Sequence, residues 1–467
     1  MAAISSPGIG SGIDVSGIVS KLVALERQPL QQLRSQASAF QTQLSLMGTI
    51  QSQVSVLQDA ATRLAGSSAW SGVTATSSNP AAVAVSVAPG TAATSLSIEV
   101  QQLARAQSGA TAVLAPGASL GAGTLHIQLG SWSGSNFTPG SPTVVDIAVI
   151  PGQDSLSAIA SQINDAGAGV TATVLRDASG ERLLLRSRET GEAAGFQLTV
   201  TDDDGSDGHD FTALALAPPS VGQTGQNARA TLNGVSITST SNRLSDTIAG
   251  LSLQLAQVTS APVEVVVTPD LADVGKNIQA LVDAYNALNN TIATGTRYDD
   301  TTKTAGPLQG DKTALGLQTA LRALLRSAST GSPFARLSDI GVEFTKGGAL
   351  GVNAEKLGQA LKDLAGLKVL FTANNGNALS NGFGLKVKSF ATGLLATEGL
   401  VTSRASAIKG ALVRNSSDQE RVHDRAARVE TRLYASYNAM DAKLGKLNAL
   451  NSYVTQQIRM WNGIDSG

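Results

Sequence analysis

Few residues in this chain could carry out chemistry. Its 467 residues include no cysteine and only three histidines, His126, His209 and His423. Without cysteine, disulfides, thiolate nucleophiles and cysteine-based zinc sites are excluded. Three histidines also leave little for metal binding.

Two glycine motifs match parts of known sites but lack their surroundings. Residues 8–12 (GIGSG) begin a dinucleotide fingerprint, yet its third glycine would fall at Ile13 or Val15, and no strand precedes it. Residues 117–121 (GASLG) match the G-x-S-x-G motif around Ser119. They follow Pro116 in a glycine-rich stretch, without the strand and helix of a nucleophile elbow. We therefore predict that residues 8–12 belong to a flexible N-terminal segment and that residues 117–121 form a loop.

The acidic run at residues 202–210 (DDDGSDGHD) is the best metal candidate, because clustered carboxylates suit calcium. It lacks the glutamate at the twelfth position of an EF-hand loop, so a solvated turn is the preferred interpretation. His423 stands beside Arg421 and Asp424 in a helical pattern, which indicates an exposed histidine. The sequence thus predicts no catalytic residue, no cofactor or cofactor-binding residue, no metal ligand and no enzymatic activity.

The overall charge excludes further classes of partner. There are 34 Lys and Arg against 35 Asp and Glu, with the two signs interspersed, which argues against nucleic acid or acidic lipid as the main partner.

Residues 1–12 lack the charged and apolar regions of a secretory signal peptide. No run reaches the roughly 20 apolar residues that span a bilayer. These features predict a cytoplasmic protein or one exported without a cleaved signal.

The N-terminal region has the apolar pattern of a helix. Val15, Ile18, Leu22 and Leu25 recur three and four apart, and Asp14 is placed to cap the helix. Proline is disfavoured in a helix interior, so Pro29 is expected to interrupt or restart it. Beyond it runs an apolar seam with heptad-like spacing. Its members are Leu33, Ala37, Phe40, Leu44, Met47, Ile50, Val54, Leu57, Ala61 and Leu64.

The C-terminal region mirrors this pattern. Its helical spacing joins Val422, Ala426, Val429, Leu433, Tyr437, Met440, Leu444, Leu447, Leu450, Val454, Ile458 and Trp461. A narrow apolar seam needs a partner, and the simplest partner is the other end of the chain. We therefore predict that residues 33–64 and 422–461 form an antiparallel helical pair.

Between the two ends the period changes to that of β-strands. Val83, Val85 and Val87 alternate, as do Leu96, Ile98 and Val100, and the Pro89-Gly90 turn signal between them predicts a hairpin. Further strands are expected at residues 125–129, 183–185, 235–237, 251–255 and 263–267. A short helix over Leu156, Ile159 and Ile163 is predicted with Asp154 as its cap. Helix returns after Pro269, at residues 274–292 and 315–325.

These elements predict an α+β multidomain fold, with long terminal helices forming a coiled-coil leg, a helical stalk and nested β-rich head domains. Residues 1–40 and 430–467 would form the leg, partly disordered when free. Residues 41–70 and 271–429 would form the stalk. Residues 71–107 and 220–270 would form a β-rich head, and residues 108–219 an inserted, variable outer head.

Three stretches resemble the flagellar filament-capping family, also known as hook-associated protein 2 or FliD. They are residues 4–26, beginning ISSPGIGSGID, residues 98–107 (IEVQQLARAQ) and the C-terminal helix around residues 437–458. Residues 163–170, 232–234 and 242–251 also resemble flagellin-like axial proteins. The similarity runs along the whole chain in the same order.

The resemblance implies a ring-like homo-oligomer at the distal tip of the bacterial flagellum, which retains exported flagellin and promotes its insertion and thereby motility. Its other implied partners are the hook–filament junction proteins, the flagellar type III export apparatus and a cytoplasmic chaperone at the C-terminal helix. Export would leave no cleaved signal. The assembly residues would be Leu33, Phe40, Leu44, Ile50, Val54, Leu57, Val429, Leu433, Tyr437, Met440, Leu444, Leu447, Val454 and Ile458.

Other functions are left open by the sequence. The Ser-, Thr- and Gly-rich middle permits an adhesin or surface-binding module, which could recognise host glycans and take part in cell adhesion. A hook–filament junction protein or flagellin is the other alternative. The helical block at residues 274–325, well before the C-terminus, fits the cap family better.

Overall fold

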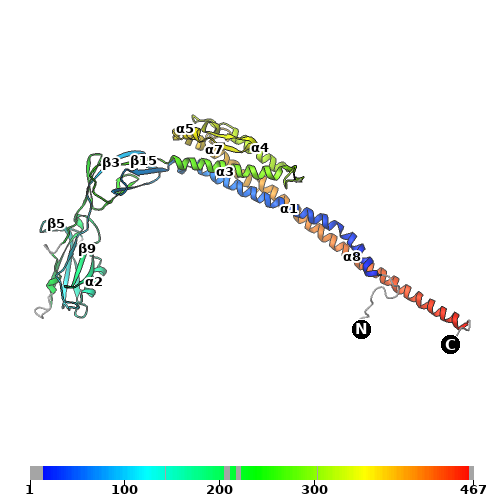
Figure 1. Ribbon diagram of the computed structural model, residues 1–467, viewed down its shortest axis with the longest axis horizontal. Helices are drawn as coiled ribbons and strands as arrows, with labels where there is room; N and C mark the ends of the chain where they lie inside the picture. The colour runs from blue at the N-terminus through cyan, green and yellow to red at the C-terminus, as the bar shows by residue number, and fades with distance from the viewer. Residues whose placement is uncertain (1–13, 142–143, 204–210, 217–221, 302, 462–467) are drawn as a thin grey trace. The chain divides into compact units, whose positions relative to one another are not determined.

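The computed structural model describes residues 14–141, 144–203, 211–216, 222–301 and 303–461. The chain divides into two compact units, and their boundaries fall at Trp70/Ser71 and Asp273/Val274. One unit combines the two ends of the chain and is helical. The other is the continuous middle and is built of strands. Figure 1 shows both units.

The helical unit is dominated by α1 (Val15–Ala65) and α8 (Leu400–Trp461), of 51 and 62 residues. Between them in the sequence come α3 (Leu271–Thr296), α4 (Lys312–Arg326), α5 (Ala354–Ala360), α6 (Leu364–Thr372) and α7 (Phe383–Leu395). Two small hairpins complete it: β16 (Tyr298–Asp299) with β17 (Thr304–Ala305), and β18 (Val342–Phe344) with β19 (Leu350–Val352).

The start of α1 follows the predicted cap but not the predicted face. The Asp14 carboxylate accepts a hydrogen bond from the Gly17 N–H at 2.8 Å, as a helix cap does. Leu22 and Leu25 are exposed, however, whereas Val19 and Val23 are buried. The stripe chosen from the sequence was wrong, because valines four apart offered a second stripe that only packing could select.

Pro29 lies inside α1, so the predicted interruption was also wrong. A proline in a helix interior costs about 3 kcal/mol through its missing N–H and its ring clash. Leu30 is 5% exposed immediately after it. Packing along the length of α1 therefore offsets a local cost that would end an isolated helix.

The core of the helical unit gathers the apolar faces of several helices. It buries Met47, Ile50, Val54, Leu57, Ala61 and Leu64 of α1 with Val274, Ile278, Leu281, Tyr285, Leu288 and Ile292 of α3. Leu317, Leu321 and Leu325 of α4 and Phe383, Val387 and Ala391 of α7 belong to the same cluster. The Trp70 indole N–H donates to the Leu64 carbonyl at 2.9 Å and satisfies the one polar group of that side chain.

In the strand unit, residues from the beginning and the end of the unit together form two sheets that share one core. Five strands take the order β1-β15-β3-β11-β12, and three take the order β13-β14-β2. Their bounds are β1 (Val73–Ser77), β2 (Val83–Val87), β3 (Thr94–Gln102), β11 (Ala228–Leu232), β12 (Val235–Ser239), β13 (Arg243–Ile248), β14 (Leu251–Leu255) and β15 (Val263–Pro269).

The predicted hairpin between β2 and β3 was wrong, although both strands exist. β2 pairs with β14 in one sheet, while β3 pairs with β15 and β11 in the other. The Pro89-Gly90 turn, with Gly90 at φ 84°, carries the chain from one sheet to the other. Strands that face each other can then bury Val83, Ile98, Leu253 and Val265 in one core.

The inserted residues form a second group of sheets with their own core. β10 (Gly195–Asp202), β6 (Asn136–Pro139) and β7 (Val145–Val149) pair with β5 (Gly123–Ser133), and β4 (Ser108–Ala110) and β8 (Val170–Asp177) pair with β9 (Gly180–Ser187). The helix α2 (Leu156–Asp165) packs on β8 and β9. The core includes Leu125, Ile127, Ile159, Ile163, Leu183 and Phe196.

The α2 cap was predicted one residue too early. The Ser155 hydroxyl accepts from the Ala158 N–H, so Ser155 is the cap and Asp154 is free for another role.

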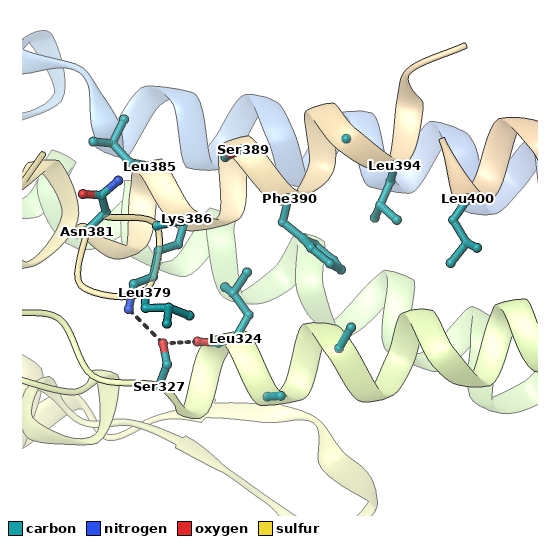
Figure 2. A pocket seen from close by; sticks show the side chains of 14 residues that line it. Leu324, Ser327, Leu379, Asn381, Leu385, Lys386, Ser389, Phe390, Leu394 and Leu400 are labelled. Atoms are coloured by element: carbon teal, nitrogen blue, oxygen red, sulfur yellow. Dashed lines mark hydrogen bonds between the residues drawn. The ribbon is translucent and has the colours of Figure 1, made fainter. Parts of the chain in front are cut away.

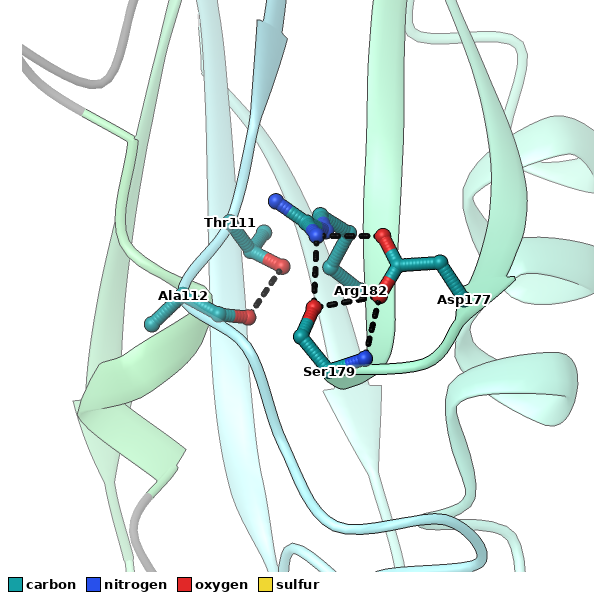
Figure 3. A network of polar contacts seen from close by, with 5 residues as sticks. All are labelled: Thr111, Ala112, Asp177, Ser179 and Arg182. Atoms are coloured by element: carbon teal, nitrogen blue, oxygen red, sulfur yellow. Dashed lines mark hydrogen bonds and ion pairs between the residues drawn. The ribbon is translucent and has the colours of Figure 1, made fainter.

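The turn between β8 and β9 is closed by a cluster of polar side chains (Figure 3). There the Asp177 carboxylate accepts from the Ser179 N–H at 2.7 Å and from Arg182 at 2.6 Å. The Ser179 hydroxyl also donates to this carboxylate and is the main cause of the lowered pKa of Asp177, followed by the Ser179 N–H.

The predicted α+β multidomain class is confirmed by these elements. The four predicted domains and their boundaries stay a prediction. Four separate apolar clusters are present among the described residues: two in the helical unit and two in the strand unit.

We expect Leu57→Ala to lower the free energy of unfolding of the helical unit by about 2–5 kcal/mol, because it removes buried methyl groups and leaves a cavity. Leu57 is 1% exposed, whereas its neighbour Val56 is 54% exposed. Val56→Ala is therefore the matched control and should change stability by less than about 0.5 kcal/mol. Urea unfolding followed by circular dichroism measures both. Equal losses in the two variants would contradict the observed packing.

Candidate assembly site

The two ends of the chain lie side by side as an antiparallel helix pair. In Figure 1 α1 and α8 run next to each other. Arg425 contacts Glu26 at 3.0 Å, and Arg27 contacts Glu430 at 3.6 Å. Further along, the Asn415 side-chain amide donates to Gln36 at 3.4 Å. These contacts fix the register, with residues near 26 opposite those near 425–430.

A small apolar cluster lies at the N-terminal end of this pair. Val15, Val19, Val23 and Ala426 are 0–3% exposed. Leu433, Tyr434 and Tyr437 of α8 pack against them and are partly buried. Sequence reasoning named Val15 and Ala426 but missed Val19 and Val23. The four-residue spacing of Val15, Val19 and Val23 was the signal that could have found them.

The predicted register of the pair was wrong. Residues 33–64 were expected to meet residues 422–461, but Ile50, Val54 and Leu57 lie in the helical core with α3 and α7. The reason is the length of α8, which begins at Leu400. In an antiparallel pair, the first half of such a helix takes the place opposite the later part of α1. Its second half then passes residues 15–27 and continues beyond the start of α1.

The predicted assembly residues therefore lie in three environments. Ile50, Val54 and Leu57 are buried, and Phe40 and Leu44 pack partly buried against the same core. Leu33, Val429, Leu433, Tyr437 and Leu444 are half-buried along the pair. Met440, Leu447, Val454 and Ile458 are exposed by 36%, 58%, 44% and 49%. The role of the whole set in assembly stays a prediction.

The last turns of α8 carry an apolar stripe that is exposed in the single chain. Leu447, Leu450, Val454, Ile458 and Trp461 recur three or four apart and share one face. Their exposed fractions range from 44% for Val454 to 91% for Trp461. An apolar face of this length is poorly suited to water. We call it the tip stripe.

Comparisons with known proteins agree with this architecture. Models of the flagellar hook-associated protein 2 N-terminus and C-terminus match residues 11–107 and 225–449, and the flagellin hook IN motif matches residues 133–189. The flagellar hook-associated protein 2 of Escherichia coli K12 is 31% identical over 98% of both chains. The chain belongs to the flagellar hook-associated protein 2 family.

Other members of the family extend the comparison. The B-type flagellar hook-associated protein 2 of Pseudomonas aeruginosa is 27% identical over 98% of both chains. A crystal structure of the D1-D2-D3 domains of the Escherichia coli flagellar cap protein FliD matches with a TM-score of 0.57 and 28% identity. It covers 78% of this chain and 99% of that one. The resemblance drawn from the sequence is thus confirmed.

The serine of the G-x-S-x-G motif is hydrogen-bonded to a buried aspartate. Ser119 donates to the Asp154 carboxylate, which is 7% exposed and also accepts from the Gly121 and Gly152 N–H groups, each at 3.1 Å. Sequence reasoning missed this pair because 35 residues separate its members. The bond from Ser119, then those from Gly121 and Gly152, hold the pKa of Asp154 below its ordinary value of 3.8, although burial opposes them.

The remaining motifs carry no site in the described part of the chain. His423 is exposed on α8, and His126 contacts Asp146 at 2.7 Å and Thr201 at 2.9 Å on the surface of β5. Residues 8–12 and most of the acidic run, with His209, lie outside the described residues. Among those described, we find no cluster of three potential metal ligands and no helix apolar enough to cross a membrane.

The register of the helix pair can be tested with engineered cysteines, since the chain has none of its own. We expect Glu26→Cys with Arg425→Cys to crosslink within one chain through a short bismaleimide, because these positions are in contact. Glu26→Cys with Lys446→Cys is the control and should not crosslink. Peptide mass spectrometry of the monomer band identifies the product. Crosslinking of the control pair alone would contradict the register.

A pH titration tests the Asp154 cluster. Because the folded pKa is below the unfolded one, the carboxylate stabilises the fold fully above its ordinary value and loses this contribution as pH falls. Asp154→Asn should therefore be less stable than the wild type near pH 6, and the difference should shrink below about pH 4. Thermal unfolding at several pH values measures it. A difference that does not change with pH would mean that the charge of Asp154 is unimportant.

Proposed function

We propose that this chain is the subunit of a flagellar filament cap. Several copies would form a scaffold at the distal tip of the filament, retain exported flagellin there and promote its insertion. The observation that carries this proposal is the tip stripe, because it lies on the terminal helix of a member of the hook-associated protein 2 family. The role is structural and supports motility without any catalytic step.

Burial of the tip stripe would supply the energy of attachment. Apolar surface removed from water contributes about 25 cal/mol per Å². Helices of flagellin or neighbouring cap subunits are the partners that could cover the stripe at the filament tip. The terminal segments would be partly disordered in the free chain, so binding and ordering would be coupled.

The route to the filament tip is part of the same proposal. We infer export through the flagellar type III apparatus without a cleaved signal, because a cap subunit must reach the far end of the filament. A cytoplasmic chaperone covering the tip stripe would keep this apolar face from aggregating before export. The hook–filament junction proteins would be the first surface on which the cap assembles.

Charges placed on the tip stripe test the proposal. Leu447→Asp with Val454→Asp should leave the melting temperature of the free chain within about 2 °C, since both side chains are exposed there. In a strain that lacks its own cap protein, this variant should fail to restore filaments, because the same carboxylates would be buried on assembly. Filament length and flagellin released into the medium are the measurements.

Ala449→Asp with Gln456→Asp is the matched control, because it adds the same charge to the opposite face of α8. This variant should restore filaments as the wild type does. If both double variants cap equally well, the tip stripe is not the attachment surface. If the wild type itself restores no filaments and stops no release of flagellin, the chain is not a cap subunit.

A further inference from the structure

A groove of about 720 Å³ lies in the helical unit between α4 and α7 (Figure 2). Ala320, Ala323 and Leu324 line one wall, and Phe390 and Gly393 line the other. The groove is open to solvent, since Leu379 at its rim is 80% exposed and Leu400 is 47% exposed. It is separate from the tip stripe and has no role in the assembly described above.

One buried cation lines this apolar groove. Lys386 is 6% exposed, and its ammonium donates to the Ser327 hydroxyl at 2.9 Å and the Ala328 carbonyl at 2.6 Å. Both acceptors lie at the C-terminal end of α4, where the helix dipole favours a cation. Within the described chain no carboxylate forms an ion pair with Lys386, and burial lowers its pKa. A carboxylate brought into the groove would complete the pairing of this charge.

The walls of the groove also leave room for another backbone. A Cβ atom at Gly393 would meet no atom within 4 Å, so alanine would fit there as well as glycine. A helix with glycine in its interior is less stable than one with alanine. No contact within the chain explains why Gly393 is glycine. Together with Ala320 and Ala323 it places small residues on both walls, between the larger Leu324 and Phe390. A helix can approach such walls more closely than it can approach leucine or phenylalanine.

The chain itself presents a helical face with the complementary features. On the face of α1 that is turned away from the core, Gly48, Ser52, Val56 and Asp59 follow one another at spacings of four, four and three. Val56 is 54% exposed, and a Cβ atom at Gly48 would meet nothing within 4 Å. Asp59 is exposed and makes no ion pair within the described residues. We call these four residues the outer α1 face.

We propose that the groove between α4 and α7 receives the outer α1 face of a second copy of this chain. Val56 would enter the apolar part of the groove, the small residues would let the helices approach, and Asp59 would pair with Lys386. The two surfaces differ, so each copy would offer one to each neighbour, and repetition around an axis would close a ring. This inference rests on the proposed cap function and assigns one contact between its subunits.

Mixed crosslinking tests the contact directly. Full-length Val56→Cys and Ser389→Cys chains, each with a single cysteine, are mixed and treated with a short bismaleimide; Ser389 lies in the groove lining. We expect a crosslinked heterodimer in the mixture, absent when Val56→Cys is replaced by Val413→Cys; Val413 lies on α8 and is 61% exposed, against 54% for Val56. Mass spectrometry of the junction peptide confirms the pair. A heterodimer with Val413→Cys but not with Val56→Cys overturns the proposal.

Self-association measured by analytical ultracentrifugation provides the second test. Gly393→Leu places a large side chain in the groove lining, and its Cβ atom would meet nothing within 4 Å. It should raise the dissociation constant at least about tenfold while leaving the melting temperature unchanged or higher. Gly358→Leu, also a helical position with nothing within 4 Å, is the control and should associate as the wild type does. Asp59→Asn should weaken association in the wild type, with a smaller effect when Lys386→Met is already present.

The outcomes separate this inference from the proposed function. A wild type that associates and caps filaments while Gly393→Leu and Asp59→Asn associate equally well overturns the groove contact and leaves the cap function standing. A wild type that remains monomeric at every concentration and also fails to cap filaments contradicts both. Tenfold or greater weakening by Gly393→Leu, together with the Val56–Ser389 crosslink, supports the contact.

Discussion

The antiparallel pairing of α1 with α8 is the interaction on which the helical unit depends. Neither helix has a wide apolar face, so each would be poorly stable alone in water. Together they bury Val15, Val19, Val23 and Ala426 at one end. At the other end α1 joins the larger core that α3, α4 and α7 complete. The two helices come from opposite ends of the sequence, so this unit needs both parts of the chain that flank residues 71–273.

That pairing also explains how the middle of the chain can be built differently. The chain leaves the helical unit at Trp70 and returns at Val274, so everything between is an insertion into it. The insertion is itself nested, since β1, β2 and β3 share sheets with β11, β12, β14 and β15, on either side of the intervening strands. Each level has its own apolar cluster, which is the physical basis for a chain with several cores.

Polar groups inside this framework are used to fix positions. Asn415 is 4% exposed and accepts from Gln419 at 2.7 Å while it donates to Gln36. A buried amide between two helices favours the one register in which its hydrogen bonds are made. Asp154 plays a similar part among the inserted strands β4 to β10, where it holds the loop of Ser119 against the start of α2. Ser119, which the G-x-S-x-G motif singled out, thus has a structural partner.

The sequence alone determined the local elements, because apolar periodicity and turn residues act over short distances. It located α3, α4 and the Asp14 cap, together with β2, β3, β5, β9, β12, β14 and β15. Its resemblance to the cap family was sufficient to assign the family. It failed where two local patterns were equally good, as with Val19 and Val23 against Leu22 and Leu25. A periodic pattern shows that a face is apolar, but it does not name what covers that face.

Tertiary structure alone decided the partners. Val83–Val87 could have paired with the next strand, but β14 and β15 offered registers that bury both strands on facing sheets. The register of α1 with α8, the tolerance of Pro29 and the meeting of Ser119 with Asp154 were settled in the same way. Each depends on contacts between residues far apart in the chain, whose energies no local stretch of sequence contains.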